Sequence, residues 1–133
     1  MATFDIEIVT PHEVVYKGEA QFIKLRTVLG DMGIMPNHAP LVSELALGEM
    51  IVRLEDKSEE SFYISGGFLE ISKEKTLILA DDAMNTKNID VLKAKKDIEE
   101  LEAKMGKIKE DMEMVEAEKL LRESLMKLNL GQK

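Results

Sequence analysis

The sequence predicts an α+β protein in which an N-terminal antiparallel β-sandwich is followed by a C-terminal antiparallel two-helix hairpin. Residues 1–84 contain short runs in which apolar and polar side chains alternate, separated by turn residues. Many short strands of this kind are typical of a sandwich or a barrel. Beyond residue 85 the apolar side chains recur at helical spacing instead. We therefore expect a β unit over residues 1–84 and a helical unit over residues 85–133.

Each strand of the β unit is expected from alternation with period two. In the first strand, Phe4, Ile6 and Ile8 are separated by acidic residues, which is the pattern of a strand with one buried face. The expected strands cover residues 4–8, 14–16, 22–29, 50–54, 62–64, 69–71 and 76–80, and the pattern over residues 41–47 is mixed. Two inner faces built from such strands would pack about 10 Å apart and enclose a core.

A stretch rich in glycine and proline, Gly-Asp-Met-Gly-Ile-Met-Pro-Asn-His-Ala-Pro-Leu-Val, occupies residues 30–42. Glycine allows backbone conformations with positive φ, and proline fixes φ and removes a donor. We expect a shaped surface loop here, with Met35 and Ala39 extended because each precedes a proline. His38, considered alone, is expected to shape this loop by hydrogen bonding rather than to act as a catalyst.

A second glycine feature is the pair Gly66 and Gly67 within the run Gly-Gly-Phe-Leu-Glu-Ile. Two interpretations of this pair are open. The one we favour is a bulge that bends the sheet. The other is a close approach by the backbone of a partner protein.

Two amphipathic helices are expected in the helical unit. Asn88 is the expected N-cap of the first helix, with Asp90 in its first turn, and Asp111 is the expected cap of the second. Gly106 interrupts the first pattern and Gly131 is expected to end the second helix. The apolar stripes are Ile89, Leu92, Ile98, Leu101, Met105 and Ile108, then Met114, Ala117, Leu121, Leu125 and Leu128. Because a two-helix hairpin is marginal alone, we expect it to pack on the sandwich or on another protein.

Composition excludes several classes of function. The 133 residues include no cysteine, so no disulfide or thiol chemistry is expected. The net charge of −8 argues against a nucleic-acid partner. Residues 1–84 carry this charge with 7 basic and 15 acidic side chains, whereas residues 85–133 hold 11 of each. No signal-peptide pattern and no bilayer-length apolar run is present, so we expect no direct membrane insertion.

No catalytic constellation or metal-ligand spacing is recognisable. His12 and His38 lie 26 positions apart, and no phosphate-binding glycine loop occurs. We therefore expect no catalytic site and no metal site, and a hydrolase built on the sandwich is disfavoured.

The loop Gly-Asp-Met-Gly-Ile-Met-Pro-Asn-His-Ala-Pro-Leu resembles that of the epsilon subunit of F-type ATP synthases from bacteria and chloroplasts. The glycine-pair strand and the order of a β half before two helices resemble this family as well. The resemblance implies a non-catalytic rotor subunit of the central stalk, which couples ion-driven rotation to ATP synthesis. The implied partners are the gamma subunit and the membrane ring of c subunits, and the implied location is peripheral, at the cytoplasmic face of the cell membrane.

The resemblance also implies interface residues in the β unit. In the epsilon family, the end of the sandwich that bears the loop faces the membrane ring, which nominates Asp31 and His38. Gly66 and Gly67 are further interface candidates under their second interpretation.

In the helical unit, the resemblance implies a regulatory arm that inhibits ATP hydrolysis when its helices extend to the catalytic alpha and beta subunits. Basic residues of the second helix meet an acidic segment of a catalytic subunit in this family, which nominates Lys119, Arg122 and Lys127. Glutamates are interleaved with these residues here, so we expect weak inhibition.

The segment Ile89-Asp90-Val91-Leu92-Lys93-Ala94 resembles the Ile/Leu-Asp-x-x-Arg-Ala motif by which some bacterial epsilon subunits bind ATP. The candidate nucleotide residues are Ile89, Asp90, Lys93 and Ala94. Lys93 replaces the arginine of the motif, and lysine lacks the planar fork that grips phosphate. No cofactor is required, and ATP is a candidate regulatory ligand. The interpretation we favour is that Asp90 meets the helix dipole and Lys93 is solvated.

An alternative function belongs to a different class. A β platform with a helical arm could be an interaction adaptor unrelated to ATP synthase. Co-purification separates the two, because a rotor subunit would accompany gamma and the catalytic subunits.

Overall fold

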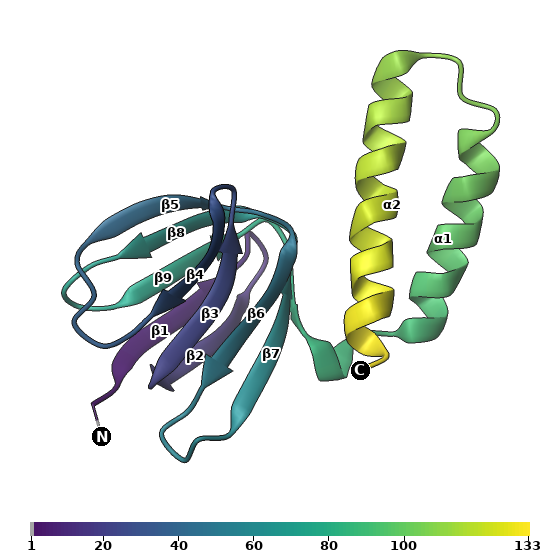
Figure 1. Ribbon diagram of the computed structural model, residues 1–133. Helices are drawn as coiled ribbons and strands as arrows, with labels where there is room; N and C mark the ends of the chain where they lie inside the picture. Colours follow the sequence, from purple (N-terminus) through teal and green to yellow (C-terminus); the bar gives the residue numbers. More distant parts are fainter. Residues whose placement is uncertain (1) are drawn as a thin grey trace. The chain divides into compact units, whose positions relative to one another are not determined.

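The computed structural model describes residues 2–133, which form two compact units. The β unit ends at Asn85 and the helical unit begins at Thr86, one residue beyond the boundary expected from the sequence. Figure 1 shows the strands of the first unit and the two helices of the second.

The β unit contains ten strands in its described residues. They are β1 (Phe4–Val9), β2 (Val14–Ala20), β3 (Phe22–Thr27), β4 (Gly30–Ile34), β5 (Leu41–Leu45), β6 (Gly48–Arg53), β7 (Glu59–Ile64), β8 (Gly67–Ile71), β9 (Thr76–Ala80) and β10 (Ala83–Asn85). Their order is β10-β7-β6-β3-β5-β8-β9-β1-β2, with β4 beside β3. β3 meets β5 through a single pair, Thr27 with Leu45, and the sheet folds there into two facing layers (Figure 1). The sandwich expected from the sequence is confirmed.

One pairing departs from the expected antiparallel arrangement. β1 runs parallel to β9, with Ile6 opposite Thr76 and Ile8 opposite Ile78. Every other strand pair among the described residues is antiparallel. The parallel pair joins strands that are far apart in the chain, so no local turn constrains their relative direction.

The stretch expected to be a loop over residues 30–42 is shorter than predicted. Gly30 to Ile34 form β4, which pairs with β3 in a register that places Asp31 opposite Arg26 and Ile34 opposite Ile23. β5 begins at Leu41. The prediction was wrong for residues 30–34 because glycines were read as turn residues, whereas the β3 ladder satisfies their backbone groups.

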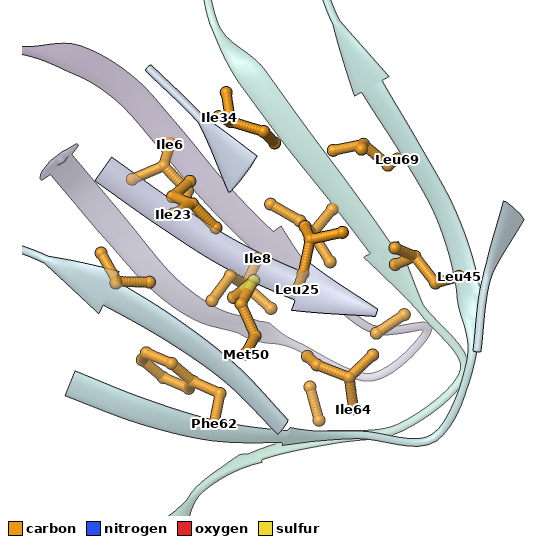
Figure 2. Close-up of a cluster of buried hydrophobic side chains, with 14 of the residues drawn as sticks. Ile6, Ile8, Ile23, Leu25, Ile34, Leu45, Met50, Phe62, Ile64 and Leu69 are labelled. Atoms are coloured by element: carbon orange, nitrogen blue, oxygen red, sulfur yellow. The ribbon is translucent and has the colours of Figure 1, made fainter. Parts of the chain in front are cut away.

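The two layers enclose one hydrophobic core (Figure 2). Ile8, Ile23 and Leu69 have no measurable exposure, and Phe62 is 1% exposed. The Phe62 ring lies 5.4 Å, centroid to centroid, from the ring of Tyr16 on β2. Sixteen buried apolar residues form this cluster: Ile6, Ile8, Ala20, Ile23, Leu25, Ile34, Leu45, Met50, Val52, Phe62, Ile64, Leu69, Ile71, Ile78, Ala80 and Ala83. Alternation with period two therefore places the inward residues as expected.

The helical unit consists of a 3₁₀ turn, η1 (Thr86–Asn88), and two helices, α1 (Val91–Met105) and α2 (Asp111–Gly131). Asp90 is the N-cap of α1, so the expected cap at Asn88 was wrong; Asn88 belongs to η1. Glu110 is the N-cap residue of α2, which places Asp111 in the first turn rather than at the cap. Gly131 is the last residue of α2, as expected from the sequence, and Gln132 is its C-cap.

Few apolar side chains of the helical unit are buried. Those classed as buried are Ile89, Ala94, Ile98, Ala117 and Leu130. Two stripe residues expected to be covered are exposed, Leu92 at 78% and Leu125 at 47%. At the end near η1 the packing is close, since a Cβ on Gly131 would lie 2.9 Å from Ile89 Cγ2.

Candidate interaction sites

The first candidate, Asp31, lies on β4 directly after the turn between β3 and β4. The Nε of Arg26 donates to Asp31 Oδ1 at 3.1 Å, and both side chains are about half exposed. The Thr27 hydroxyl donates to the carbonyl of Gly30 at 2.8 Å and accepts from the amide of Leu29 at 3.2 Å. These bonds hold a tight turn that leaves the Leu29 side chain 93% exposed. Sequence reasoning missed this apolar tip, because Leu29 was expected to be the last residue of a strand.

His38 lies in the short loop between β4 and β5. Its amide donates to the carbonyl of Met35 at 3.3 Å, and its ring Nδ1 lies 2.7 Å from the carbonyl oxygen of Ala39. Asn37 has a positive φ of 66°. Both of these contacts lie within the loop that bears His38, which agrees with the loop-shaping role expected from the residue alone.

A hollow of about 530 Å³ opens beside this loop. Its walls include His38, Phe4 at the start of β1, and the turn from Ser72 to Lys75. At its rim, Lys75 Nζ donates to Glu7 Oε1 at 2.8 Å. This hydrogen bond lowers the pKa of Glu7 and raises the pKa of Lys75 from their ordinary values.

The structure does not bring Asp31 and His38 together. Asp31 lies next to the β3–β4 turn, and His38 follows the opposite end of β4. A strand of five residues spans about 16 Å at 3.3 Å per residue. The two residues are thus candidates for contacts at opposite ends of β4.

The glycine pair is explained within the sheet. Gly66 and Gly67 have φ of 138° and 128°, which side chains rarely adopt. A Cβ on Gly67 would lie 2.0 Å from the backbone carbonyl oxygen of Leu79 on β9. The close approach at Gly67 therefore comes from a neighbouring strand of the same chain, and a role of this pair in an interface remains a prediction.

The nucleotide candidates divide into buried and exposed residues. Ile89 and Ala94 are 9% and 4% exposed, so their side chains belong to the interior of the helical unit. Asp90 and Lys93 are exposed. The carboxylate of Asp90 accepts from the amide of Lys93 at 3.0 Å and caps α1. Only Asp90 and Lys93 are thus placed to meet a ligand in solvent.

The basic candidates lie on α2. Lys119 and Arg122 are exposed, while Lys127 is half-buried. Because Lys119 and Arg122 are three positions apart on a helix, their side chains lie on neighbouring turns of one face.

Neither metal nor membrane-spanning features were found in residues 2–133. The described histidines and carboxylates form no group of three or more that could hold a metal ion. None of the described helices combines the length and the apolar character needed to cross a bilayer.

Comparison with known proteins identifies relatives along the whole chain. A family model for the β-sandwich domain of the ATP synthase delta/epsilon chain matches residues 3–86. The sodium-ion-specific ATP synthase epsilon chain of Propionigenium modestum is 47% identical over 132 residues, covering 99% of this chain and 96% of that protein. The ATP synthase epsilon chain of Moorella thermoacetica is 34% identical over 128 residues, covering 96% of each.

The chain also resembles chains in solved structures of ATP synthases. A chain in the OSCP/F1/c-ring structure of the Euglena gracilis mitochondrial ATP synthase matches with a TM-score of 0.81 and 25% identity, covering 100% of this chain and 83% of that one. A chain of the Tetrahymena thermophila mitochondrial ATP synthase central stalk and c-ring matches with a TM-score of 0.53 and 17% identity, covering 64% and 68%. The second match supports the fold alone.

Proposed function

The chain belongs to the delta/epsilon chain family of ATP synthase, and from this premise we propose that its β unit docks the central stalk while its helical unit regulates ATP hydrolysis. Membership makes the chain a non-catalytic subunit of the ATP synthase complex. The alternative of an adaptor unrelated to ATP synthase is thereby set aside. The proposed partners are the gamma subunit, the membrane ring of c subunits, and the catalytic alpha and beta subunits when the helices are extended.

The observation that carries the regulatory proposal is the incomplete burial of the helical unit. Met112 is 84% exposed and Val115 is 64% exposed. A groove of about 460 Å³ lies between the helices near their turn, and Leu101, Ile108 and Leu120 line it. Exposed apolar surface of this kind marks a site of interaction. The hairpin therefore suits an element with a second packing arrangement, separated from the first by a few kcal/mol.

Helix lengths set the reach of such an arm. α1 has 15 residues and α2 has 21. At 1.5 Å per residue they are about 22 and 31 Å long, or about 54 Å when placed end to end. The extended arm would carry Lys119 and Arg122 toward the catalytic subunits, with Lys127 further along α2.

The regulatory proposal is tested by truncation after Asn85 in a reconstituted ATP synthase. We expect hydrolysis to rise while the truncated chain stays in the complex, because β10 ends at Asn85 and the sandwich core is kept whole. A charge reversal of Lys119 and Arg122 should give a smaller rise in the same direction. The matched control reverses the charges of Lys95 and Lys96, which are exposed on α1. Unchanged hydrolysis after truncation, at every nucleotide concentration, would contradict the proposal.

ATP is the proposed regulatory ligand of the helical unit, with Asp90 and Lys93 as the contacting residues. Calorimetric titration of the whole chain with ATP tests this. Asp90→Asn removes the negative charge but keeps an N-cap acceptor, so it separates a ligand role from a capping role. Lys93→Arg should tighten binding, because arginine can hold a phosphate with two hydrogen bonds. No heat of binding for the wild-type chain or for Lys93→Arg would contradict a nucleotide role.

Contact with the membrane ring is proposed for one end of the β unit, and with it a location at the cytoplasmic face of the membrane. Asp31 and His38 mark opposite ends of β4, so single-residue crosslinking decides which end is involved. We expect Asp31→Cys to crosslink to the ring, since the exposed Leu29 tip accompanies it. Crosslinking through His38→Cys alone would assign the other end.

A further inference from the structure

The charges of the two helices are separated along the hairpin. In α1, residues 91–96 hold three basic side chains and no acidic one, whereas residues 97–105 hold four acidic and one basic. In α2 the order is reversed, with four acidic side chains and no basic one over residues 111–118, then three basic and one acidic over residues 119–131. Because the helices lie antiparallel beside each other (Figure 1), they are basic at the end near η1 and acidic at the end near their connecting turn.

The hairpin alone does not account for this separation. Lys93 stands in the first turn of α1, where the helix dipole favours an acidic residue, and that turn contains none. The basic half of α1 lies beside the basic half of α2, and the acidic halves are neighbours as well, so like charges repel within the hairpin. A partner whose charges run in the opposite direction would offset this repulsion.

An open apolar face accompanies these charges. The groove between the helices near their turn continues into a smaller hollow of about 280 Å³, and the two share Leu101, Lys104 and Leu120. Leu120 is 41% exposed. We call the side of the hairpin that bears both hollows the groove face. An apolar surface with charged residues around it is typical of a protein interface.

Three residues of α2 have a self-complementary order on the groove face. Glu113 lies seven positions before Leu120, and Lys127 lies seven positions after it. Seven residues make about two helical turns, so the three side chains lie in one line along α2. If two α2 helices cross antiparallel at Leu120, Glu113 of each copy comes level with Lys127 of the other copy. The same surface then serves both partners, as a two-fold symmetric contact requires.

The size of the groove face suits a weak dimer. α2 is about 31 Å long, and two helices side by side are about 20 Å wide, so one face offers about 600 Å². Two such faces would bury about 1,200 Å² in total, which is the lower end of the range for specific interfaces. We therefore expect reversible association with a Kd in the micromolar range rather than a permanent dimer.

We propose that the groove face docks a second copy of this chain, through antiparallel pairing of the two α2 helices about Leu120. Leu120 forms the apolar contact at the two-fold axis. Two pairs of Glu113 with Lys127, one on each side of the axis, set the direction and register of the helices. The proposal concerns the free chain and does not rest on the function proposed above.

Sedimentation equilibrium of the whole chain at low salt tests the pairing. We expect a monomer–dimer equilibrium that weakens as salt is added. Glu113→Lys and Lys127→Glu should each raise the dimer Kd by about tenfold or more, because each variant places like charges opposite each other twice. An equimolar mixture of the two variants should dimerise again, because each chain offers the charge that the other lacks. The matched control is Glu118→Lys, which makes the same charge change on the opposite side of α2 from Leu120 and should leave the Kd within about twofold.

A second readout locates the two-fold axis. The chain has no cysteine, so Leu120→Cys provides a single thiol per chain. Two such thiols meet at the axis, and mild oxidation should join them in a disulfide-linked dimer, since the bond needs closely spaced backbones. The control is Val115→Cys, at an exposed position about 140° around the helix from Leu120, which should link about tenfold more slowly or less.

Each outcome supports or overturns the second copy as occupant. A wild-type chain that stays monomeric up to about 1 mM would overturn it. A dimer that persists unchanged in both charge variants would overturn the pairing through α2, and so would a mixture that fails to dimerise while both variants keep the wild-type helix content by circular dichroism. A monomeric free chain whose Leu120→Cys thiol is protected from alkylation in the assembled ATP synthase would assign the groove face to another subunit instead.

Discussion

The β unit buries its apolar side chains more completely than the helical unit does. Sixteen buried apolar residues form one cluster in the sandwich, whereas five apolar residues of the helical unit are classed as buried. Ten strands share ladder bonds across two layers, but α1 and α2 have only each other and η1 within their unit. Burial supplies most of the free energy that opposes chain entropy. The comparison teaches that a well-packed unit and a sparsely packed one can be joined in one chain by distributing apolar residues unequally.

The largest effect is expected from Gly67→Ala in the sandwich. An added Cβ would meet the Leu79 carbonyl oxygen at 2.0 Å in a backbone with φ of 128°, so we expect a loss of more than about 4 kcal/mol in the free energy of unfolding. Urea denaturation measures it. The matched control is Gly30→Ala, which has φ of 125° and open space around the new Cβ; it should cost only about 1–3 kcal/mol for backbone strain. Equal losses in the free energy of unfolding for the two variants would show that the close approach of β9 to Gly67 does not add to the cost of the substitution.

Leu69→Ala is expected to have the next largest effect. Leu69 is 0% exposed in the core of the sandwich, and truncation of such a leucine costs about 2–5 kcal/mol because a cavity is left behind. The partner variant in the helical unit is Leu120→Ala, at a side chain that is 41% exposed; it should cost less than about 1 kcal/mol. Urea denaturation measures both losses in the free energy of unfolding. Similar values for the two variants would contradict the proposed difference in packing between the two units.

Gly131→Ala tests the close packing within the helical unit. A Cβ there would lie 2.9 Å from Ile89 Cγ2 and from Val91 Cγ2, so we expect a loss of about 1–3 kcal/mol confined to the helical unit. Hydrogen exchange by mass spectrometry should show faster exchange in η1, α1 and α2 and unchanged exchange in the sandwich. Gly106→Ala is the control, with φ of −63° and no near contact; it should be neutral or stabilising by about 0.4–1 kcal/mol.

The smallest effect concerns the ion pair of Lys75 with Glu7. The hydrogen bond from Lys75 lowers the pKa of Glu7 below its ordinary value of 4.5. A carboxyl with a lowered pKa in the folded state contributes stability above its unfolded pKa, and this is lost as pH falls through the folded pKa. The wild-type chain should therefore lose its advantage over Glu7→Gln as the pH falls below about 4.5. Thermal melts of both chains from neutral to acidic pH measure this, and parallel curves would contradict it.

Local sequence patterns predicted where the strands lie better than they predicted which strands pair. Alternation was enough to place Ile6 and Ile8 in the core, because the side-chain period of a strand is a property of the backbone itself. The parallel pairing of β1 with β9 had no signal in the sequence, since it depends on how distant strands meet. β4 was missed because Gly30 and Gly33 are common in turns, while its pairing comes from the β3 ladder.

For the candidate sites, too, the sequence predicted residue types better than their positions in the fold. The cap of α1 was expected at Asn88 and lies at Asp90. Both residue types can cap a helix, and Asn88 belongs to η1 instead. The resemblance nominated Asp31 and His38 together because both were expected in one loop, whereas β4 (Gly30–Ile34) contains Asp31 and separates it from His38.

The difference between the two units is tested most directly by native-state hydrogen exchange of the intact chain, resolved along the sequence. We expect amides of β1, β8 and β9 to exchange only through global unfolding, and amides of α1 and α2 to exchange through a separate opening that needs less free energy. Addition of urea should leave the two opening free energies distinct until the global transition. A single opening free energy shared by the strands and the helices, lost together in urea, would contradict the account.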